Sequence, residues 1–194
     1  MTQCHRRDAI LAAAERLFRH YGPAKTTMAD IAREAGVGVG SVYLEFAAKD
    51  ALIEALSRAR HASVLCAMRE ALSRGDDWAA RFRAVLDARV RALLDTADDG
   101  AHGGDLVLCG HGAVRETHAR FRTEEVALVA DLLREAQAVG EFAAGDADAA
   151  ARTVLSAYAA FDPPRLYERP RDAVWAELQA THNLVLHGLL RRTP

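Results

Sequence analysis

Four side chains of the kinds that bind metal ions lie close together near the middle of the chain. His102, Cys109, His111 and His118 flank a glycine-rich stretch. Imidazole and thiolate groups are common ligands of zinc and of haem iron. The spacing of Cys109 and His111 matches no known ligand motif, however, and glycines at such a position more simply end a helix. We therefore expect a loop here, with no bound metal and no other cofactor.

The same segment contains the residues for a metal-assisted active site, which is the enzymatic alternative. Such a site would combine His111 and His118 with Asp105 or Glu116. The chain shows no nucleophile–base motif and no phosphate-binding loop. The sequence therefore favours a protein that is not an enzyme.

The three cysteines, Cys4, Cys66 and Cys109, lie far apart in the sequence. Their odd number and the lack of a Cys-x-x-Cys pair indicate free thiols in a reducing cytoplasm, not a disulfide framework. A redox-sensing role for Cys66 or Cys109 stays open as an alternative. Neither residue has a resolving partner near it in the sequence.

A pair of short helices is predicted between residues 28 and 46. A helix-turn-helix needs a small residue where its helices cross, and Ala32 supplies it. Gly36 follows four residues later, where the turn needs a residue that tolerates positive φ. The apolar positions facing the shared core are Ile31, Ala35, Val37 and Val42. Together these features predict a helix-turn-helix, and the alternative is a helical hairpin that binds another protein.

Helices are expected nearly everywhere else, because apolar residues recur three and four positions apart. We find no strand-like alternation and no internal repeat. The predicted helices span residues 6–21, 28–35, 41–46, 48–74, 78–96, 115–139, 147–160 and 171–190, with a short apolar segment at 105–112. The sequence therefore predicts an all-α fold with about nine helices.

The overall composition is that of an ordinary globular protein, with 51% hydrophobic and 27% charged residues. A net charge of −2 does not suit a protein that coats nucleic acid without specificity. No apolar run is long enough for a membrane span, and the first residues read as an amphipathic helix, not a signal peptide. We expect a soluble cytoplasmic protein that does not bind membranes.

The residues around the predicted helix-turn-helix closely resemble the TetR family of transcriptional regulators. The matching segments are Thr-Thr-Met-Ala-Asp-Ile-Ala at 26–32, Ala-Gly-Val at 35–37, Gly-Ser-Val-Tyr at 40–43, Phe46, and Lys-Asp-Ala-Leu at 49–52. The resemblance covers about residues 6–56, and beyond them only the length and the helix pattern match. It implies a DNA-binding domain at 1–48 and a ligand-binding and dimerisation domain at 49–194.

The function that the resemblance implies is ligand-responsive control of transcription. A homodimer would bind a palindromic, double-stranded DNA operator as a repressor and leave it when a small, largely apolar effector binds. Activation is the less usual alternative. The sequence identifies neither the operator nor the effector.

The resemblance also assigns roles to residues of the DNA-binding domain. It places the recognition helix at 38–45 and implies phosphate contacts from Thr27, Tyr43 and Lys49, with Phe46 anchoring the helix to the core. The full set of expected DNA-binding residues is Thr26, Thr27, Gly38, Val39, Gly40, Ser41, Tyr43, Leu44, Glu45 and Lys49.

Three positions of the expected recognition helix depart from the family pattern. The family usually has a polar or basic residue at Val39 and often aromatic or histidine residues at Leu44 and Glu45. Val39 and Leu44 offer only apolar contacts, for instance with thymine methyl groups. Glu45 brings a negative charge near the DNA backbone unless it accepts a hydrogen bond from a cytosine amino group. Hydrogen-bonded base reading then depends on Ser41, Glu45 and backbone atoms, so we expect DNA shape to contribute.

An effector pocket is expected among the helices that follow residue 50. For any single candidate residue ordinary core is the favoured interpretation, but as a set they suggest a mostly apolar ligand with few polar anchors. The candidates are Leu65, Met68, Trp78, Phe82, Leu108, Phe121, Leu128 and Tyr158. Three arginines, Arg81, Arg89 and Arg122, either pair with an anionic ligand or lie solvated on a face.

Two apolar stripes near the end of the chain predict a dimer interface. Two such helices from each subunit make a four-helix bundle around a two-fold axis. The expected interface residues are Ala151, Val154, Leu155, Tyr158, Trp175, Leu178, His182, Val185 and Leu189. We expect His182 to be a hydrogen-bonded interface residue that makes dimer stability depend on pH.

Overall fold

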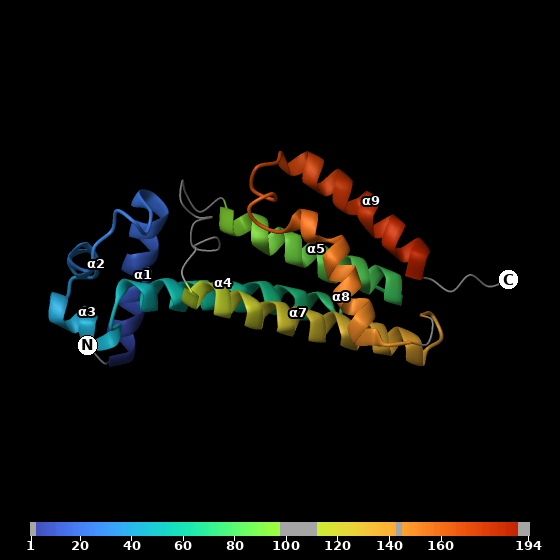
Figure 1. Cartoon of the computed structure of the whole chain (residues 1–194), viewed down its shortest axis with the longest axis horizontal. Helices are drawn as coiled ribbons and strands as arrows, with labels where there is room; N and C mark the ends of the chain where they lie inside the picture. The colour runs from blue at the N-terminus through green and yellow to red at the C-terminus, as the bar shows by residue number, and fades with distance from the viewer. Residues whose placement is uncertain (1–2, 98–111, 143–144, 190–194) are drawn as a thin grey trace. The chain divides into compact units, whose positions relative to one another are not determined.

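The computed structural model describes residues 3–97, 112–142 and 145–189 (Figure 1). That part of the chain forms eight α-helices and one 3-10 turn. They are α1 (Gln3–Tyr21), α2 (Met28–Ala35), α3 (Val39–Glu45), α4 (Lys49–Ala71), α5 (Trp78–Ala97), α7 (Gly112–Ala138), α8 (Ala147–Ala157), η1 (Ala159–Phe161) and α9 (Arg171–Leu189). The predicted all-α fold is confirmed.

The chain divides into two compact units. The first contains Met1–His61 and Asp95–Ala119, and the second contains Ala62–Leu94 and Arg120–Pro194. None of the described helices is long and apolar enough to cross a membrane. The domain boundary expected at residue 48 stays a prediction.

The first unit is built on a small core shared by α1, α2, α3 and the start of α4. α1 packs on α2, and α2 packs on α3. The residues Ile10, Phe18, Ile31, Val42 and Leu52 are all fully buried in this core. Burying large apolar side chains such as these is the main favourable contribution to folding. The short α3 therefore keeps its position through tertiary contacts, not through its own helix propensity.

The turn between α2 and α3 has the geometry that the sequence predicts. Gly36 ends α2 at φ 66°, in the left-handed region, and its N–H reaches the carbonyls of Ala32 and Arg33. At the other end of α2, Thr27 and Asp30 form a reciprocal capping box. Local sequence signals thus set both ends of the helix that supports α3.

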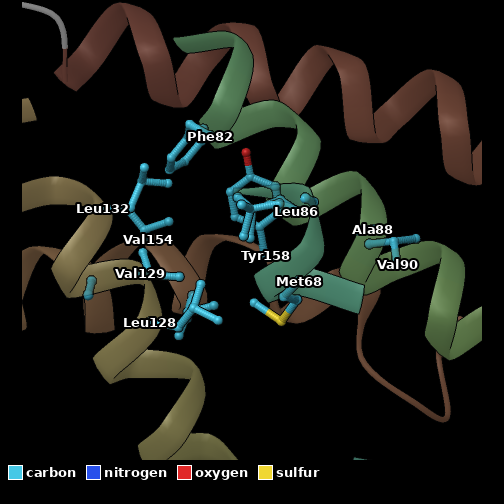
Figure 2. Packing of buried hydrophobic residues seen from close by; sticks show 14 of the residues in the cluster. Met68, Phe82, Leu86, Ala88, Val90, Leu128, Val129, Leu132, Val154 and Tyr158 are labelled. Atoms are coloured by element: carbon cyan, nitrogen blue, oxygen red, sulfur yellow. The ribbon is translucent and has the colours of Figure 1, made fainter. Parts of the chain in front are cut away.

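The second unit holds the larger core, to which α4, α5, α7, α8 and α9 contribute. Figure 2 shows Met68, Phe82, Leu128 and Tyr158 directed toward one another from four separate segments. The indole of Trp78 lies in the same core and donates a hydrogen bond from Nε1 to the carbonyl of Leu132 at 3.0 Å. Trp78 therefore ties α5 to α7.

α1, α3 and α7 begin two or three residues before their predicted starts, and two helices, α4 and α8, end three residues before their predicted ends. α4 ends at Ala71 instead of residue 74, because the chain passes through a turn to Gly75, which has φ 120°. α8 ends at Ala157, and the residues up to Phe161 form the 3-10 turn η1 instead of a further α-helical turn. The cap that the sequence predicts for α8 is confirmed, since the Asp146 side chain accepts hydrogen bonds from two N–H groups of its first turn.

Candidate functional site

The outer face of α3 carries Leu44, the most exposed large apolar side chain among the described residues of the first unit. Val42 points into the core and is fully buried. A residue two positions later lies on nearly the opposite side of a helix, and Leu44 is 81% exposed there. Tyr43 and Val39 flank it with 52% and 43% exposure. These three side chains are large, and the fold of the first unit leaves them uncovered.

The other predicted DNA-binding residues differ in how far they reach the surface. Thr27, Gly38 and Gly40 are exposed, whereas Ser41, Glu45 and Lys49 are only half-exposed. Thr26 is buried. Its hydroxyl donates a hydrogen bond to the carbonyl of Gly22 at 2.9 Å, which gives Thr26 a structural role.

Glu45 has a partner that the sequence does not reveal. Arg6 of α1 donates two hydrogen bonds to Oε1 of Glu45, from Nε at 2.9 Å and from Nη2 at 2.5 Å. The Glu45 side chain is only 7% exposed as a result. The two residues lie 39 positions apart, so no local pattern indicates the pair. The charge of Glu45 is therefore paired inside the chain, and Oε1, one of its two carboxylate oxygens, accepts both hydrogen bonds.

Lys49 is also engaged by the first unit itself. Its Nζ donates to the carbonyl of Pro23 at 2.6 Å and to the carbonyl of Thr26 at 3.1 Å. An ammonium group has three donors, so one N–H is left for a phosphate. Lys49 thus holds the turn before α2 in place from the start of α4.

The N-terminus of α2 already carries a negative charge. The Thr27 hydroxyl donates to Oδ2 of Asp30 at 2.6 Å and accepts from the Asp30 N–H at 3.1 Å. The hydrogen bonds from Thr27 and, less strongly, the charge of Arg33 lower the pKa of the Asp30 carboxyl. A DNA phosphate at this helix end would have to share the N–H groups with that carboxylate.

The residues expected to line an effector pocket come together in the core of the second unit. Leu65, Met68, Trp78, Phe82, Phe121, Leu128 and Tyr158 are all buried in one cluster, and Leu108 lies outside the described residues. A groove of about 340 Å³ lies beside this core, between α4 and α7. Its lining is half apolar and half charged, with Leu72, Ala127, Leu128 and Leu132 beside Arg69, Glu124, Asp131 and Glu135.

Arg89 is not solvated on a face, which corrects one of the two alternatives for this residue. It is 2% exposed and donates from Nε to Glu125 and from Nη2 to Asp162, each at 2.5 Å. Arg122 contacts the same two carboxylates at 3.3 and 3.4 Å. Burial alone lowers the pKa of Arg89, but the carboxylates of Glu125 and Asp162 raise it overall. Arg81 forms a more exposed pair with Glu135 at 3.0 Å.

His182 links two polar groups inside the second unit. Its Nδ1 lies 2.6 Å from the Tyr158 hydroxyl, and its Nε2 lies 2.9 Å from Oδ1 of Asp87. With a proton on Nε2, the ring donates to Asp87 and accepts from Tyr158. Burial, and then the charge of Asp87, raise the pKa of the Tyr158 hydroxyl. The hydrogen bonding expected for His182 is present, but both of its partners belong to the same chain.

Most of the residues expected at a dimer interface are covered by their own chain. The buried ones are Ala151, Val154, Leu155, Tyr158, Leu178 and His182. Trp175 and Val185 are half-exposed, and the side chain of Leu189 lies outside the described residues. Because a covered side chain has no surface left for a partner, these stripes first build the core of the second unit. The face of α9 that stays exposed carries Leu184 at 76% exposure.

The histidine and cysteine cluster falls mostly outside the described residues, which include neither His102 nor Cys109 nor His111. His118 lies on α7, with its ring centroid 5.8 Å from that of His61 on α4. Within the described ranges, no group of three or more His, Cys, Asp or Glu residues could hold a metal ion. Cys66 is exposed, and the Glu70 carboxylate raises the pKa of its thiol, which disfavours a reactive thiolate.

Comparison with known proteins adds matches over both units. Residues 10–56 match the family "Bacterial regulatory proteins, tetR family", and residues 78–181 match "Tetracyclin repressor-like, C-terminal domain". The HTH-type transcriptional regulator TtgR of Pseudomonas putida is 47% identical over 55 residues, which are 28% of this chain and 26% of TtgR. The chain therefore matches only about a quarter of the length of that relative.

Solved structures match over nearly the whole chain. A protein from Mesorhizobium loti MAFF303099 assigned to the TetR family has a TM-score of 0.78 at 16% identity, covering 98% of this chain and 100% of that one. The SmeT–triclosan complex has a TM-score of 0.68 at 20% identity, covering 96% of this chain and 92% of SmeT. At these identities the likeness is one of fold.

Proposed function

Since the chain belongs to the TetR family of bacterial helix-turn-helix transcriptional regulators, we propose that it is a repressor that binds a palindromic operator as a homodimer and leaves it when a small, largely apolar effector binds. Proteins of this family are regulators of transcription and not enzymes. A regulator of this kind would work in the bacterial cytoplasm, where its operators are.

The exposed face of α3 is the observation that carries the DNA-binding part of the proposal. Leu44, Tyr43 and Val39 stay uncovered on a helix that two buried side chains, Val42 and Phe46, fix to the core. An α-helix fits the major groove of DNA. The Tyr43 hydroxyl and the remaining N–H of Lys49 would then contact phosphates.

The exposed face of α9 supports assembly into a homodimer. Ala176, Ala180 and Leu184 follow one another four residues apart, and all three are exposed. Residues with this spacing lie on one side of a helix. A second copy of α9 would cover them around a two-fold axis, as two-fold operators require.

The buried aromatic side chains of the second unit support a largely apolar effector. Trp78, Phe82 and Tyr158 lie in one cluster, so a ligand that enters it would meet mostly apolar surface. SmeT, which shares this fold, has been solved with triclosan. A coupling free energy of about 1–3 kcal/mol between effector and operator would be enough for release.

The first experiment is selection of bound duplexes from a random DNA library with the purified protein at near-physiological salt. We expect a palindrome whose half-sites lie about 34–36 Å apart, one turn of DNA. Leu44→Asp is the matched control, because it places a negative charge on the exposed face of α3 without touching the core. The variant should keep its melting temperature and recover no consensus sequence.

Two outcomes would contradict the proposal. Recovery of no consensus by the wild-type protein would favour the alternative that the hairpin binds another protein. A consensus without two-fold symmetry would contradict the homodimer. Compounds found to bind the purified protein can then be tested for their effect on its affinity for the recovered operator. A compound that binds tightly but leaves this affinity unchanged is not an effector.

A further inference from the structure

The face of α3 that would enter the major groove offers few hydrogen-bonding side chains for bases, because the hydroxyl of the exposed Tyr43 is expected at a phosphate. Leu44 and Val39 are apolar, and Gly40 has no side chain. Ser41 is half-buried, and Glu45 is bonded to Arg6. If this face reads base sequence, it has to do so mainly through apolar contacts. The inference that follows rests on the proposed function, because it concerns how the same site selects its operator.

The ion pair with Arg6 removes the one acidic group of α3 from competition for bases. Reading of cytosine by a carboxylate needs an acceptor oxygen that faces the groove. Oε1 of Glu45 already accepts two hydrogen bonds from Arg6, and the Glu45 side chain is 7% exposed. The other oxygen, Oε2, could accept from a base only if this largely covered side chain turned toward the groove, and that movement would break the charge-assisted pair with Arg6. Leu44 is thus left as the most exposed large apolar side chain of α3.

Gly40 gives Leu44 room to approach the base pairs. It lies within α3, one helical turn before Leu44, and a Cβ at Gly40 would have no atom within 4 Å. The chain itself therefore gives no steric reason for glycine, which is a poor residue inside a helix. A bare backbone at position 40 lets the floor of the groove come close to this side of α3.

We propose that Leu44, assisted by Val39, selects operators by packing against thymine C5-methyl groups in the major groove. Thymine is the base that presents a methyl group there, so an apolar side chain distinguishes a T·A pair from the others. The half-site contacted by α3 then contains at least one thymine whose methyl group, and not its O4 atom, carries the preference.

The test replaces single thymines of the recovered operator by deoxyuridine, which differs only in lacking the methyl group. At fixed salt, removal of the contacted methyl should weaken wild-type binding about fourfold in one half-site and about fifteenfold in both. Replacing that thymine by cytosine should also weaken binding, and 5-methylcytosine at the same position should recover most of the loss. Deoxyuridine at thymines outside the half-sites should have no effect.

Two variants assign the contact to a residue. Leu44→Ala should lose most of the fourfold difference between the thymine and deoxyuridine operators, because the side chain that makes the main contact with the methyl group is gone and only Val39 remains. Tyr43→Phe is the matched control on the same face. It should weaken binding to both operators by the same factor and keep the fourfold difference between them.

The outcomes separate this inference from the proposed function. An operator that is bound specifically but is insensitive to every deoxyuridine replacement would overturn the inference and leave the function intact. A fourfold difference that persists in full in Leu44→Ala would overturn the assignment to Leu44. Failure to select any operator would overturn the proposed function and the inference together.

Discussion

The surface that α3 presents depends on single polar residues that are bonded inside the first unit. Arg6 holds Glu45, and Lys49 closes the turn before α2 by contacting the carbonyls of Pro23 and Thr26. Polar groups engaged in this way stabilise the unit and are less available to DNA. At the residue scale, two features make the exposed face of α3 apolar. Leu44 lies on it, and Arg6 binds the Glu45 carboxylate so that this side chain is only 7% exposed.

Loss of Arg6 should release the negative charge of Glu45 toward the DNA. We expect Arg6→Ala to weaken operator binding about tenfold, a difference of ~1.4 kcal/mol, because like charges near a phosphate backbone repel. The measurement is the dissociation constant of the operator at two salt concentrations. Adding Glu45→Gln to Arg6→Ala should restore most of the affinity. If the double variant binds as weakly as Arg6→Ala, Arg6 itself contacts the DNA and the explanation is wrong.

Gly40 should show opposite effects on stability and on binding. Alanine is a better helix residue than glycine, so Gly40→Ala should raise the free energy of unfolding by up to about 1 kcal/mol. The added methyl group meets nothing in the free chain but would meet DNA, so operator affinity should fall. Urea denaturation and operator titration of the same preparation measure the two quantities. Unchanged operator affinity would mean that DNA does not come close to residue 40.

At the scale of elements, a pair of histidines makes the contact between α4 and α7 sensitive to pH. Burial, and then the neighbouring charge of His118, lower the pKa of His61 from 6.5 to about 4. The folded chain therefore binds fewer protons than the unfolded chain between these two values. Its stability should be fully present above about pH 6.5 and should fall as the pH drops toward 4.

The expected loss from His61 is on the order of 2 kcal/mol between pH 7 and pH 4.5. Urea denaturation at several pH values measures it. His61→Gln keeps a polar side chain that does not titrate, so this variant should lose less stability over the same interval. An identical pH dependence in wild type and variant would show that other groups cause it.

Elements whose signals are local could be predicted from the sequence, and tertiary pairs could not. The capping box at Thr27, the left-handed Gly36 and the cap at Asp146 each depend on residues a few positions apart. By contrast, the pair of Arg6 with Glu45 and the contacts of Arg89 with Glu125 and Asp162 join distant segments. A sequence pattern cannot reveal such pairs, because they arise only when the helices pack.

The stripe expected at the dimer interface shows a related difficulty. An apolar face indicates that a helix is covered, but not whether its own chain or a second copy covers it. Leu178 and His182 are covered from within, while Leu184, six positions after Leu178, stays exposed. The same ambiguity applies to the residues expected to line the pocket, because an apolar side chain can line a cavity or belong to the core. Those that lie within the described residues are all packed into one core.

At the scale of the whole molecule, the proposed dimer can be tested through Leu184. Leu184→Arg should convert the dimer to a monomer, because a charge on the exposed face of α9 would have to be buried against the second copy. Sedimentation gives the molecular mass directly. Val139→Arg is the matched control, since Val139 is also large, apolar and 68% exposed but lies outside α9.

The Leu184→Arg variant should also bind the palindromic operator much more weakly, with an affinity close to that for a single half-site. The control variant should stay dimeric and bind normally. A monomeric wild-type protein, or a Leu184→Arg variant that is still dimeric, would mean that the copies meet elsewhere or not at all.

The two tryptophans of the chain, Trp78 and Trp175, both belong to the second unit. Trp78 is buried with its indole N–H bonded to a carbonyl, and Trp175 lies under the Arg91 guanidinium. Tryptophan fluorescence of this protein, excited selectively, therefore comes from the second unit, while the helices of both units contribute to circular dichroism. If the two signals report different midpoints on heating, the units unfold separately. If tryptophan emission changes when operator DNA binds to α3, the change shows that the two units are coupled. This measurement needs no added label.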